Sequence, residues 1–210
     1  MEIRFTPSPT RTARNGLSIN SCGTCQPDQS CEHRFDRFSQ MSVFWTRPDV
    51  SIWVAWLSTA GWQGKQLLGP GSASPSSRLT AVTRLELRIN FFYVGNYKRV
   101  RRIYWKSENP GTWNEPSEPI SNLPETLGGL GSVSMNSNHQ EVFFFGTNSK
   151  IKHAYWTESA NTWKSEALPG ANDGCMPNGS LEVVSRRDGT MEGWCKATSN
   201  TALVDFYFYA

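Results

Sequence analysis

The chain has 210 residues and a formal net charge of +3, from 21 basic and 18 acidic side chains. This mild balance argues against a nucleic-acid partner, because proteins that bind nucleic acid usually carry a concentrated basic face. Aromatic residues reach 12%, with nine tryptophans, against 19% charged residues. Such a composition predicts short strands and turns and argues against a helical bundle.

The chain opens with a polar segment, residues 1–32, which we expect to be poorly ordered before a folded domain at 33–210. Its first stretch, MEIRFTPSPTRTARNG, contains no apolar run as long as a signal peptide requires. No stretch of the sequence is long and apolar enough for a membrane-spanning helix. We therefore expect no membrane span, and either a cytoplasmic location or secretion without a signal peptide.

The opening segment also holds three of the five cysteines, an odd total that cannot be fully paired within one chain. Cys22, Cys25, Cys31 and His33 nearly supply four zinc ligands, but the spacing after the first pair is irregular. We expect no bound metal and no cofactor. The pairing of these cysteines stays open, since a Cys22–Cys31 bridge would need an oxidising compartment.

Four units with one common pattern follow, beginning near residues 33, 79, 130 and 180. Val82, Val133 and Val184 mark the last three units at equal spacings of about 50 residues. An aromatic residue follows each valine at the same distance, as Phe92, Phe143 and Trp194. An aromatic pair and a lone tryptophan then follow, as Tyr104-Trp105 with Trp113 and Tyr155-Trp156 with Trp163, while the first unit holds Phe44, Ile52, Trp56 and Trp62 in the same order.

Each unit reads as four short β-strands joined by turns. In the third unit the strands are predicted at 130–135, 141–146, 150–156 and 162–168, where apolar and polar residues alternate. Gly, Asn, Ser and Asp in the connecting stretches suit tight hairpins. Four antiparallel strands in about 50 residues match one blade of a β-propeller. The predicted fold is all-β, a propeller of about four four-stranded blades or a fragment of a larger propeller.

The last unit stops before its fourth strand, and two explanations stay open. The N-terminal stretch MEIRFTP could supply the missing strand and close a four-bladed ring. Alternatively, the chain is a piece of a longer propeller with an open blade edge, which would favour a homo-oligomer. The basic stretch Lys98–Arg102 in the second unit alternates along a strand, so its charges are expected to divide between the two faces.

The unit sequences resemble the blades of propeller lectins. SVFWTRPDVSIWVAW at 42–56 and EVFFFGTNSKIKHAYWTESANTW at 141–163 are similar to the fungal fucose-specific lectins and the bacterial seven-bladed fucose-binding propellers. The resemblance covers residues 34–210. In the fungal lectins a sugar lies between adjacent blades, bonded by an arginine and a glutamate of one blade and stacked on two aromatic rings of the next.

This resemblance implies a carbohydrate-binding function, with glycans as partners and fucose as a candidate ligand. The arginine position holds Ser42, Asn90 and Glu141, and the glutamate position holds Val54, Arg102 and His153. The first unit has Leu57 where the others have the first aromatic ring. The candidate sugar-binding residues are Trp62, Asn90, Arg102, Trp105, Trp113, Glu141, His153, Trp156 and Trp163. The tryptophans also fit a second interpretation, as residues that only pack blade against blade.

Two other function classes are weaker. An enzyme is not expected, because glycoside hydrolysis needs paired carboxylates and the candidates do not recur in pairs; these are Glu141, Glu158, Glu166, Asp188 and Glu192. The sequence also lacks the G-x-S-x-G, phosphate-loop and H-E-x-x-H motifs. A non-catalytic propeller that binds other proteins is the alternative, on the analogy of the fold.

Overall fold

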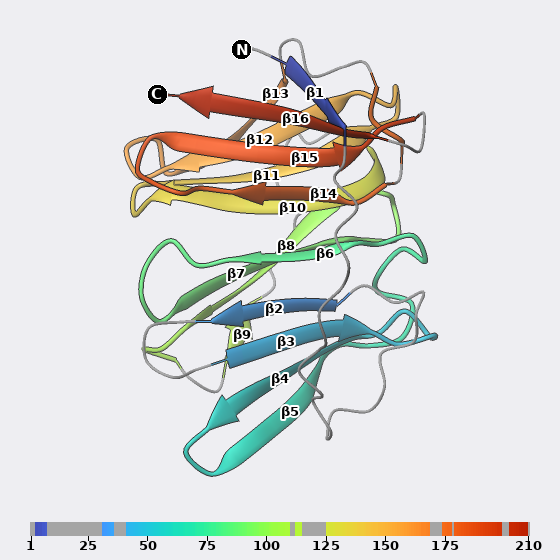
Figure 1. Cartoon of the computed structure of the whole chain (residues 1–210). Coiled ribbons are helices and arrows are strands. Elements are labelled where there is room, and N and C mark those ends of the chain that lie inside the picture. The colour runs from blue at the N-terminus through green and yellow to red at the C-terminus, as the bar shows by residue number, and fades with distance from the viewer. Residues whose placement is uncertain are drawn as a thin grey trace.

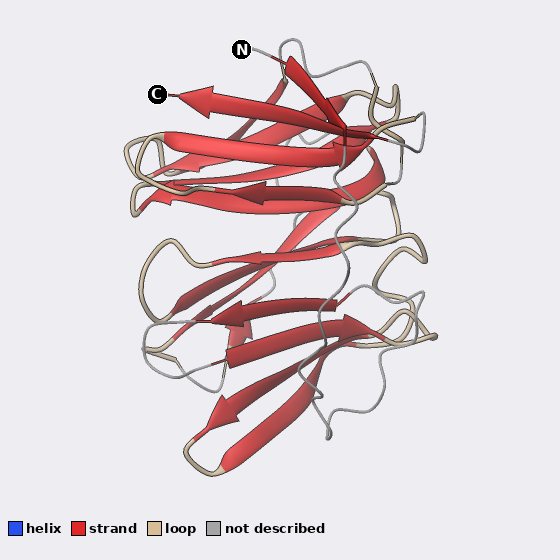
Figure 2. Ribbon diagram, viewed as in Figure 1, coloured by secondary structure: helices blue, strands red, loops and turns tan. Residues whose placement is uncertain are grey.

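The computed structural model describes residues 3–7, 31–35, 41–109, 112–114, 125–168, 174–177, 179–198 and 202–209. Every regular element in these ranges is a β-strand (Figure 2). The strands form four antiparallel four-stranded sheets, one for each sequence unit. The prediction of an all-β fold built from propeller blades is therefore confirmed. The described part of the chain also contains no helix that could span a membrane.

The sheets follow the order of the chain, except that the last one takes a strand from the N-terminus. The first blade contains β2 (Cys31–Phe35), β3 (Met41–Thr46), β4 (Ile52–Ser58) and β5 (Gly61–Leu68). The second contains β6 (Leu79–Val82), β7 (Arg88–Val94), β8 (Val100–Lys106) and β9 (Trp113–Asn114). The third contains β10 (Thr126–Asn136), β11 (His139–Gly146), β12 (Ile151–Thr157) and β13 (Thr162–Ala167). The fourth contains β14 (Leu181–Val184), β15 (Thr190–Lys196), β16 (Ala202–Tyr209) and β1 (Ile3–Pro7).

The sequence repeat is also a repeat of strand register. The three marker valines lie in the first strands of their blades and pair with equivalent residues of the second strands: Val82 with Asn90, Val133 with Glu141 and Val184 with Glu192. At the ends of the third strands, Leu57 pairs with Trp62, Trp105 with Trp113 and Trp156 with Trp163. Positions that correspond in the sequence therefore occupy corresponding places in successive blades.

The fourth blade is completed by the N-terminal strand. β1 pairs antiparallel with β16, with Ile3 opposite Phe206 and Pro7 opposite Ala202. The N-terminal stretch therefore supplies the missing strand, as one of the two explanations proposed, but it does not close a four-bladed ring, because the first and fourth blades lie at opposite ends of the structure (Figure 1). Residues 8–30, with Cys22 and Cys25, lie outside the described residues. The domain boundary at residue 33, the absence of metal there and the cysteine pairing stay predictions.

The blades lie one on another, with the first and fourth at opposite ends of the stack (Figure 1). The first strand of each blade contacts that of the next, from β2 to β6, β10 and β14. Thr80 and Ser132 share a hydrogen bond of 2.8 Å between β6 and β10. Between β10 and β14, a Cβ at Gly131 would lie 2.6 Å from the Leu181 carbonyl oxygen, so this close approach requires glycine.

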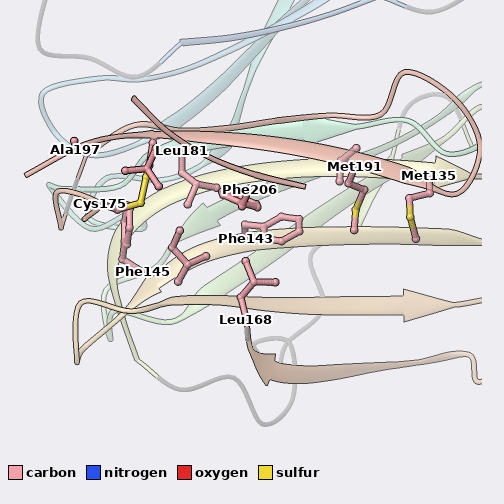
Figure 3. Close-up of a cluster of buried hydrophobic side chains, with 13 residues drawn as sticks. Met135, Phe143, Phe145, Leu168, Cys175, Leu181, Met191, Ala197 and Phe206 are labelled. Carbon is pink, nitrogen blue, oxygen red and sulfur yellow. A yellow bond between two sulfur atoms is a disulfide. The ribbon is translucent and has the colours of Figure 1, made fainter. Parts of the chain in front are cut away.

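Neighbouring blades are held together by three buried apolar clusters, one at each blade interface. Phe91 belongs to the cluster between the first and second blades, and Phe92 to the cluster between the second and third. Phe144 lies in that same middle cluster, whereas Phe143 packs toward the fourth blade (Figure 3). The two-residue period of a strand sends consecutive phenylalanines to opposite faces. Each aromatic run therefore stabilises two interfaces, at about 2–3 kcal/mol for each buried ring.

The cluster between the third and fourth blades contains a disulfide that the sequence analysis did not predict. Cys175 and Cys195 are bonded, with Cα atoms 5.7 Å apart, and both side chains are buried among apolar residues (Figure 3 labels Cys175). Cys175 precedes β14 and Cys195 lies in β15. The bond therefore ties the entry of the fourth blade to its second strand.

The face of the first blade that points away from the second is rich in tryptophan. Trp45 and Trp53 stack there with ring centroids 6.3 Å apart, and the Arg47 guanidinium lies 3.8 Å from the Trp53 ring centroid. Trp62 is 38% exposed, and it shares this face because it pairs with Leu57, which alternates with Trp56 along β4. At the other end of the stack, Leu203 is also exposed. These two end faces carry apolar side chains that no described blade covers.

Candidate binding site between the second and third blades

An open cleft of about 380 Å³ lies between the second and third blades. Its volume falls in the range of small-molecule sites in proteins. The second blade contributes Arg84, Arg88, Asn90, Arg102, Tyr104 and Lys106 to its lining, and the third contributes Gln140, Trp156, Glu158, Asn161 and Trp163. The residues between blades that the sequence analysis chose as one site, Asn90 and Arg102 with Trp156 and Trp163, are therefore brought together here.

Strand alternation explains why these side chains meet. Arg102 is the cross-strand partner of Phe92, which packs toward the third blade, so both side chains project from that face. Trp156 and Trp163 are cross-strand partners in the third blade. Trp156 alternates with Tyr155 and shares the face of Ala154, which packs toward the second blade. One blade therefore supplies the polar wall and the next supplies the aromatic wall.

The aromatic wall is fixed by contacts across the interface. The Trp163 ring meets Phe92 edge-on, with centroids 5.6 Å apart and an interplanar angle of 81°. The Arg84 guanidinium lies 4.3 Å from the Trp156 ring centroid and forms an ion pair of 2.9 Å with Glu158. Arg84 also donates a hydrogen bond to the Ser137 carbonyl oxygen. Both indole rings are thus held in place before any ligand arrives.

Two buried polar atoms at this cleft have no hydrogen-bond partner among the described residues. One is the Nε1 donor of Trp163, and the other is the Oε1 acceptor of Gln140, a residue that is only 2% exposed. Buried polar groups in proteins are nearly always hydrogen-bonded, and leaving one unpaired costs about 1–3 kcal/mol. One unpaired donor and one unpaired acceptor therefore lie at this cleft.

Arg102 is the central cation of the cleft. Its guanidinium lies 5.1 Å from the Tyr104 ring centroid and 5.7 Å from the Trp163 ring centroid. Burial lowers the pKa of Arg102 from its ordinary value, although the group stays charged near neutral pH. The prediction that the charges of Lys98–Arg102 divide between two faces is confirmed, because Arg101 pairs with Tyr93 on the face toward the first blade.

A second cleft, of about 240 Å³, lies between the third and fourth blades. Its lining includes Glu141 and His153, the residues chosen as the polar pair of the third unit, with Phe206 and Met191 from the fourth blade. The Glu141 carboxylate contacts both neighbouring histidines, 2.7 Å from His153 Nδ1 and 2.7 Å from His139 Nε2. Glu141 is 3% exposed, and each of its carboxylate oxygens is already bonded to a histidine.

Opposing effects act on the pKa of Glu141. Burial raises it, but hydrogen bonds and charge from His139 and His153 outweigh burial and hold the pKa below its ordinary value. Glu166, on the same cleft, accepts a hydrogen bond of 2.9 Å from the Tyr155 hydroxyl. No cluster of His, Cys, Asp and Glu in the described ranges has a geometry that would hold a metal ion.

The other candidate residues lie outside these two groupings. Trp113 packs edge-on against Phe44 of the first blade, with ring centroids 5.6 Å apart, and contacts Trp105 in the same cluster. Trp105 is 9% exposed and also reaches the edge of the cleft between the second and third blades. Trp62 lies on the exposed outer face of the first blade. These contacts indicate that Trp105 and Trp113 pack the first blade against the second.

Several lining residues were not identified from the sequence. Gln140 directly precedes Glu141, and alternation could have placed it, because Gln140 shares the face of Val142 and Phe144 toward the second blade. Arg84 follows the marker Val82 by two positions, just beyond β6. Its role arises from contacts with the third blade, which the sequence of its own unit does not reveal.

No protein-family model matches the sequence, and no curated protein matches it. Several solved structures do match this chain. AofleA from Arthrobotrys oligospora matches with a TM-score of 0.66 and 18% identity, over 81% of this chain and 51% of that one. The BP39L lectin from Burkholderia pseudomallei matches with a TM-score of 0.72 and 16% identity, over 95% and 57% of the two chains.

A lectin from Aleuria aurantia, described as a six-bladed β-propeller with a novel fucose recognition mode, matches with a TM-score of 0.64 and 12% identity. That match covers 87% of this chain and 59% of the lectin. The chain therefore has the β-propeller fold of fungal and bacterial lectins. It spans between half and three-fifths of the length of these proteins.

Proposed function

We propose that the protein is a carbohydrate-binding protein that holds a sugar between its second and third blades. The observation that carries the proposal is the cleft itself, where indole rings stand beside an unpaired donor, an unpaired acceptor and the Arg102 cation. A pyranose has an apolar C–H face that suits an aromatic ring and hydroxyls that suit polar groups. The likeness to propeller lectins supports the same reading through the fold.

Fucose is one candidate ligand. The SapL1 lectin, with a TM-score of 0.67 and 18% identity to this chain over 82% of it and 58% of that lectin, was solved in complex with alpha methyl fucoside. In this chain Asn90 and Arg102 stand where the resemblance would place the arginine and the glutamate. Because these polar groups differ, the hydroxyls of a bound sugar are expected to be contacted in a different pattern. We therefore propose sugar binding at the cleft, with fucose as one of several sugars to be tested.

The proposed function is non-catalytic. Among the described residues that line the cleft, Glu158 is the one carboxylate, and Arg84 holds it in an ion pair. Glycosidic hydrolysis needs two carboxyl groups that flank the bond.

The expected affinity of a single site is low. One ring contact and a few hydrogen bonds contribute about 4–6 kcal/mol, which corresponds to a Kd of roughly 40 μM to 1 mM. Tighter binding to a glycan surface would come from several sites acting together.

A glycan array tests this function. The wild-type protein is expected to bind a restricted set of glycans, and Trp163→Ala to lose that binding. Trp194→Ala is the matched control, because Trp194 projects from the far face of the fourth blade, opposite the side of Met191 and Cys195. Circular dichroism would verify that each variant is folded. Absence of binding to any glycan, or equal binding by the Trp163→Ala variant, would refute the proposal.

A protein-interaction role is the second candidate, and the outer face of the first blade favours it. The stacked Trp45 and Trp53 and the exposed Trp62 offer an apolar surface of the kind that docks on another protein or another copy. Sedimentation velocity over a range of concentrations tests self-association. If the protein stays monomeric at high concentration, this face does not bind a second copy of the chain.

A further inference from the structure

We propose that the cleft between the second and third blades takes a saccharide that carries a carboxylate, and that Arg102 binds this carboxylate. The inference rests on the proposed function, since it names the class of sugar for that same cleft. It follows from the charges that line the cleft, from the surroundings of Arg102, and from the two unpaired polar atoms beside it.

Among the described residues that line the cleft, positive side chains outnumber negative ones. Arg84, Arg88, Arg102 and Lys106 line it, with Glu158 as the acidic lining residue. Two of the cations are neutralised: Arg84 by Glu158 at 2.9 Å, and Arg88 by Glu108 at 3.1 Å. Arg102 and Lys106 have no ion pair among the described residues. The positive charge that remains favours an anionic ligand over a neutral one.

The surroundings of Arg102 are unusual for a largely buried guanidinium. It contacts the rings of Tyr104 and Trp163, and no described residue gives it a hydrogen bond or an ion pair. A guanidinium has five N–H donors in a fixed planar fork. Aromatic faces attract its charge but leave these donors unbonded. A carboxylate matches the fork with two parallel charge-assisted hydrogen bonds, which a single neutral hydroxyl cannot provide.

The other groups of the cleft suit the remainder of an acidic sugar. The buried Oε1 of Gln140 can accept a hydrogen bond from a hydroxyl, and Nε1 of Trp163 can donate one. The Trp163 and Trp156 rings provide apolar surface for the C–H face. A pyranose with a carboxylate therefore supplies what each unsatisfied group lacks. A uronic acid and a sialic acid share this chemistry.

The cleft between the third and fourth blades gives an internal contrast. Its polar lining includes the carboxylates Glu141 and Glu166 with His139 and His153, and none of the described residues that line it is a lysine or an arginine. The Glu141 carboxylate already occupies both histidines, so this cleft offers a ligand carboxylate no free guanidinium among the described residues. The two clefts occupy equivalent places between blades, but the second has no group like Arg102 among its described lining residues, so the preference for an acidic sugar is expected at the first of them alone.

Isothermal titration calorimetry with matched pairs of sugars tests the inference. The pairs are D-galacturonic acid with D-galactose and D-glucuronic acid with D-glucose, at pH 7 with matched sodium chloride. N-acetylneuraminic acid distinguishes a sialic-acid site from a uronic-acid site. We expect at least one acid to bind about tenfold or more tightly than a neutral sugar, because charge-assisted bonds to carboxylate are the stronger kind. Added salt should weaken that binding.

Variants assign the effect to the cleft. Arg102→Gln removes the charge and should abolish the preference for the acid. Lys196→Gln makes the same change on an exposed residue of the fourth blade and should keep the preference. If Arg102→Gln fails to fold, Arg102→Lys provides the second test, because lysine keeps the charge but cannot form two parallel bonds to a carboxylate, so the preference for the acid should fall about fivefold or more.

The outcomes separate the inference from the proposed function. Equal binding of acidic and neutral sugars would overturn the inference and leave sugar binding standing. A preference for the acid that survives in Arg102→Gln, or that is undiminished in Arg102→Lys where that variant stands in, would also overturn it. If none of these sugars binds while the glycan array shows binding of neutral glycans, the carboxylate is not the recognised group. Failure on the array as well would overturn both.

Discussion

Trp163 meets Phe92 edge-on across the second and third blades, with ring centroids 5.6 Å apart and planes at 81°. Trp113 meets Phe44 across the first and second blades in the same way, at 5.6 Å and 84°. The tryptophan that begins the fourth strand of a blade therefore packs on the second strand of the blade before it. At the second interface this same ring also lines the cleft.

Loss of the Trp163 ring should cost stability as well as binding. Trp163→Ala is expected to lower the free energy of unfolding by about 2–4 kcal/mol, because loss of this partly buried ring removes its packing on Phe92 and leaves a cavity at the interface. Trp62→Ala, at the equivalent position but 38% exposed, should cost about 1 kcal/mol or less. Urea unfolding measures both. Equal losses in the two variants would contradict the role of the Phe92 contact.

Glu141 should make stability depend on pH. Its pKa is lowered in the folded protein, so its contribution is complete above the ordinary glutamate pKa of about 4.3 and is lost as the pH falls through the folded value. Glu141→Gln is expected to lose about 1–3 kcal/mol at pH 7, with a difference from wild type that shrinks in acid.

Urea unfolding at a series of pH values measures this difference. Glu125→Gln is the matched control, because Glu125 is exposed, and this variant should unfold like the wild type at every pH. A Glu141→Gln difference that stays constant or grows as the pH falls would contradict the prediction.

The N-terminal strand should stabilise the fourth blade. Removing Met1–Pro7 leaves the edge of β16 without the partner that pairs from Ala202 to Phe206. The melting temperature is expected to fall by about 2–8 °C, which corresponds to a loss of about 1–2 kcal/mol. Removing only the two residues before Ile3 is the control and should leave the melt unchanged. An unchanged melt after the longer deletion would show that β1 contributes nothing to stability.

The Cys175–Cys195 bond should stabilise the same blade. It closes a loop with a sequence separation of 20, for which the loss of unfolded-state entropy corresponds to about 3 kcal/mol. Unfolding with and without a reducing agent measures this contribution, and the double variant Cys175→Ala, Cys195→Ala should show no effect of the reductant. Stability that is the same in reduced and oxidised wild-type protein would contradict the prediction.

The sequence predicted the blades because alternation and a regular period are local properties. The spacing of the marker valines corresponds to one strand register in three blades, so the cross-strand pairs of Trp105 with Trp113 and of Trp156 with Trp163 could be anticipated. The grouping of Asn90 and Arg102 with the next blade's tryptophans came from the resemblance to lectins. That grouping could not be derived from the strands of one unit, because it also requires knowing which blade lies next to which.

What the sequence did not reveal depends on contacts between units. Gln140 and Glu141 are neighbours in β11 but line different clefts, and their partners come from different blades. The Cys175–Cys195 bond forms only where the chain enters the fourth blade. The exposure of Trp62 also has this origin, because no described blade covers the face on which it lies. All three features depend on how one blade packs on the next, which the sequence of a single unit does not specify.

Direct observation of the indole N–H groups by nuclear magnetic resonance, during titration with the glycan that binds best on the array, is the most direct test of a sugar site between the second and third blades. Nine indole signals are available, one for each tryptophan. The signals of Trp163 and Trp156 are expected to shift, with Trp163 moving most, while those of Trp45 and Trp194 stay in place. Shifts confined to tryptophans outside the cleft, or no shift at saturating glycan, would contradict the proposed site.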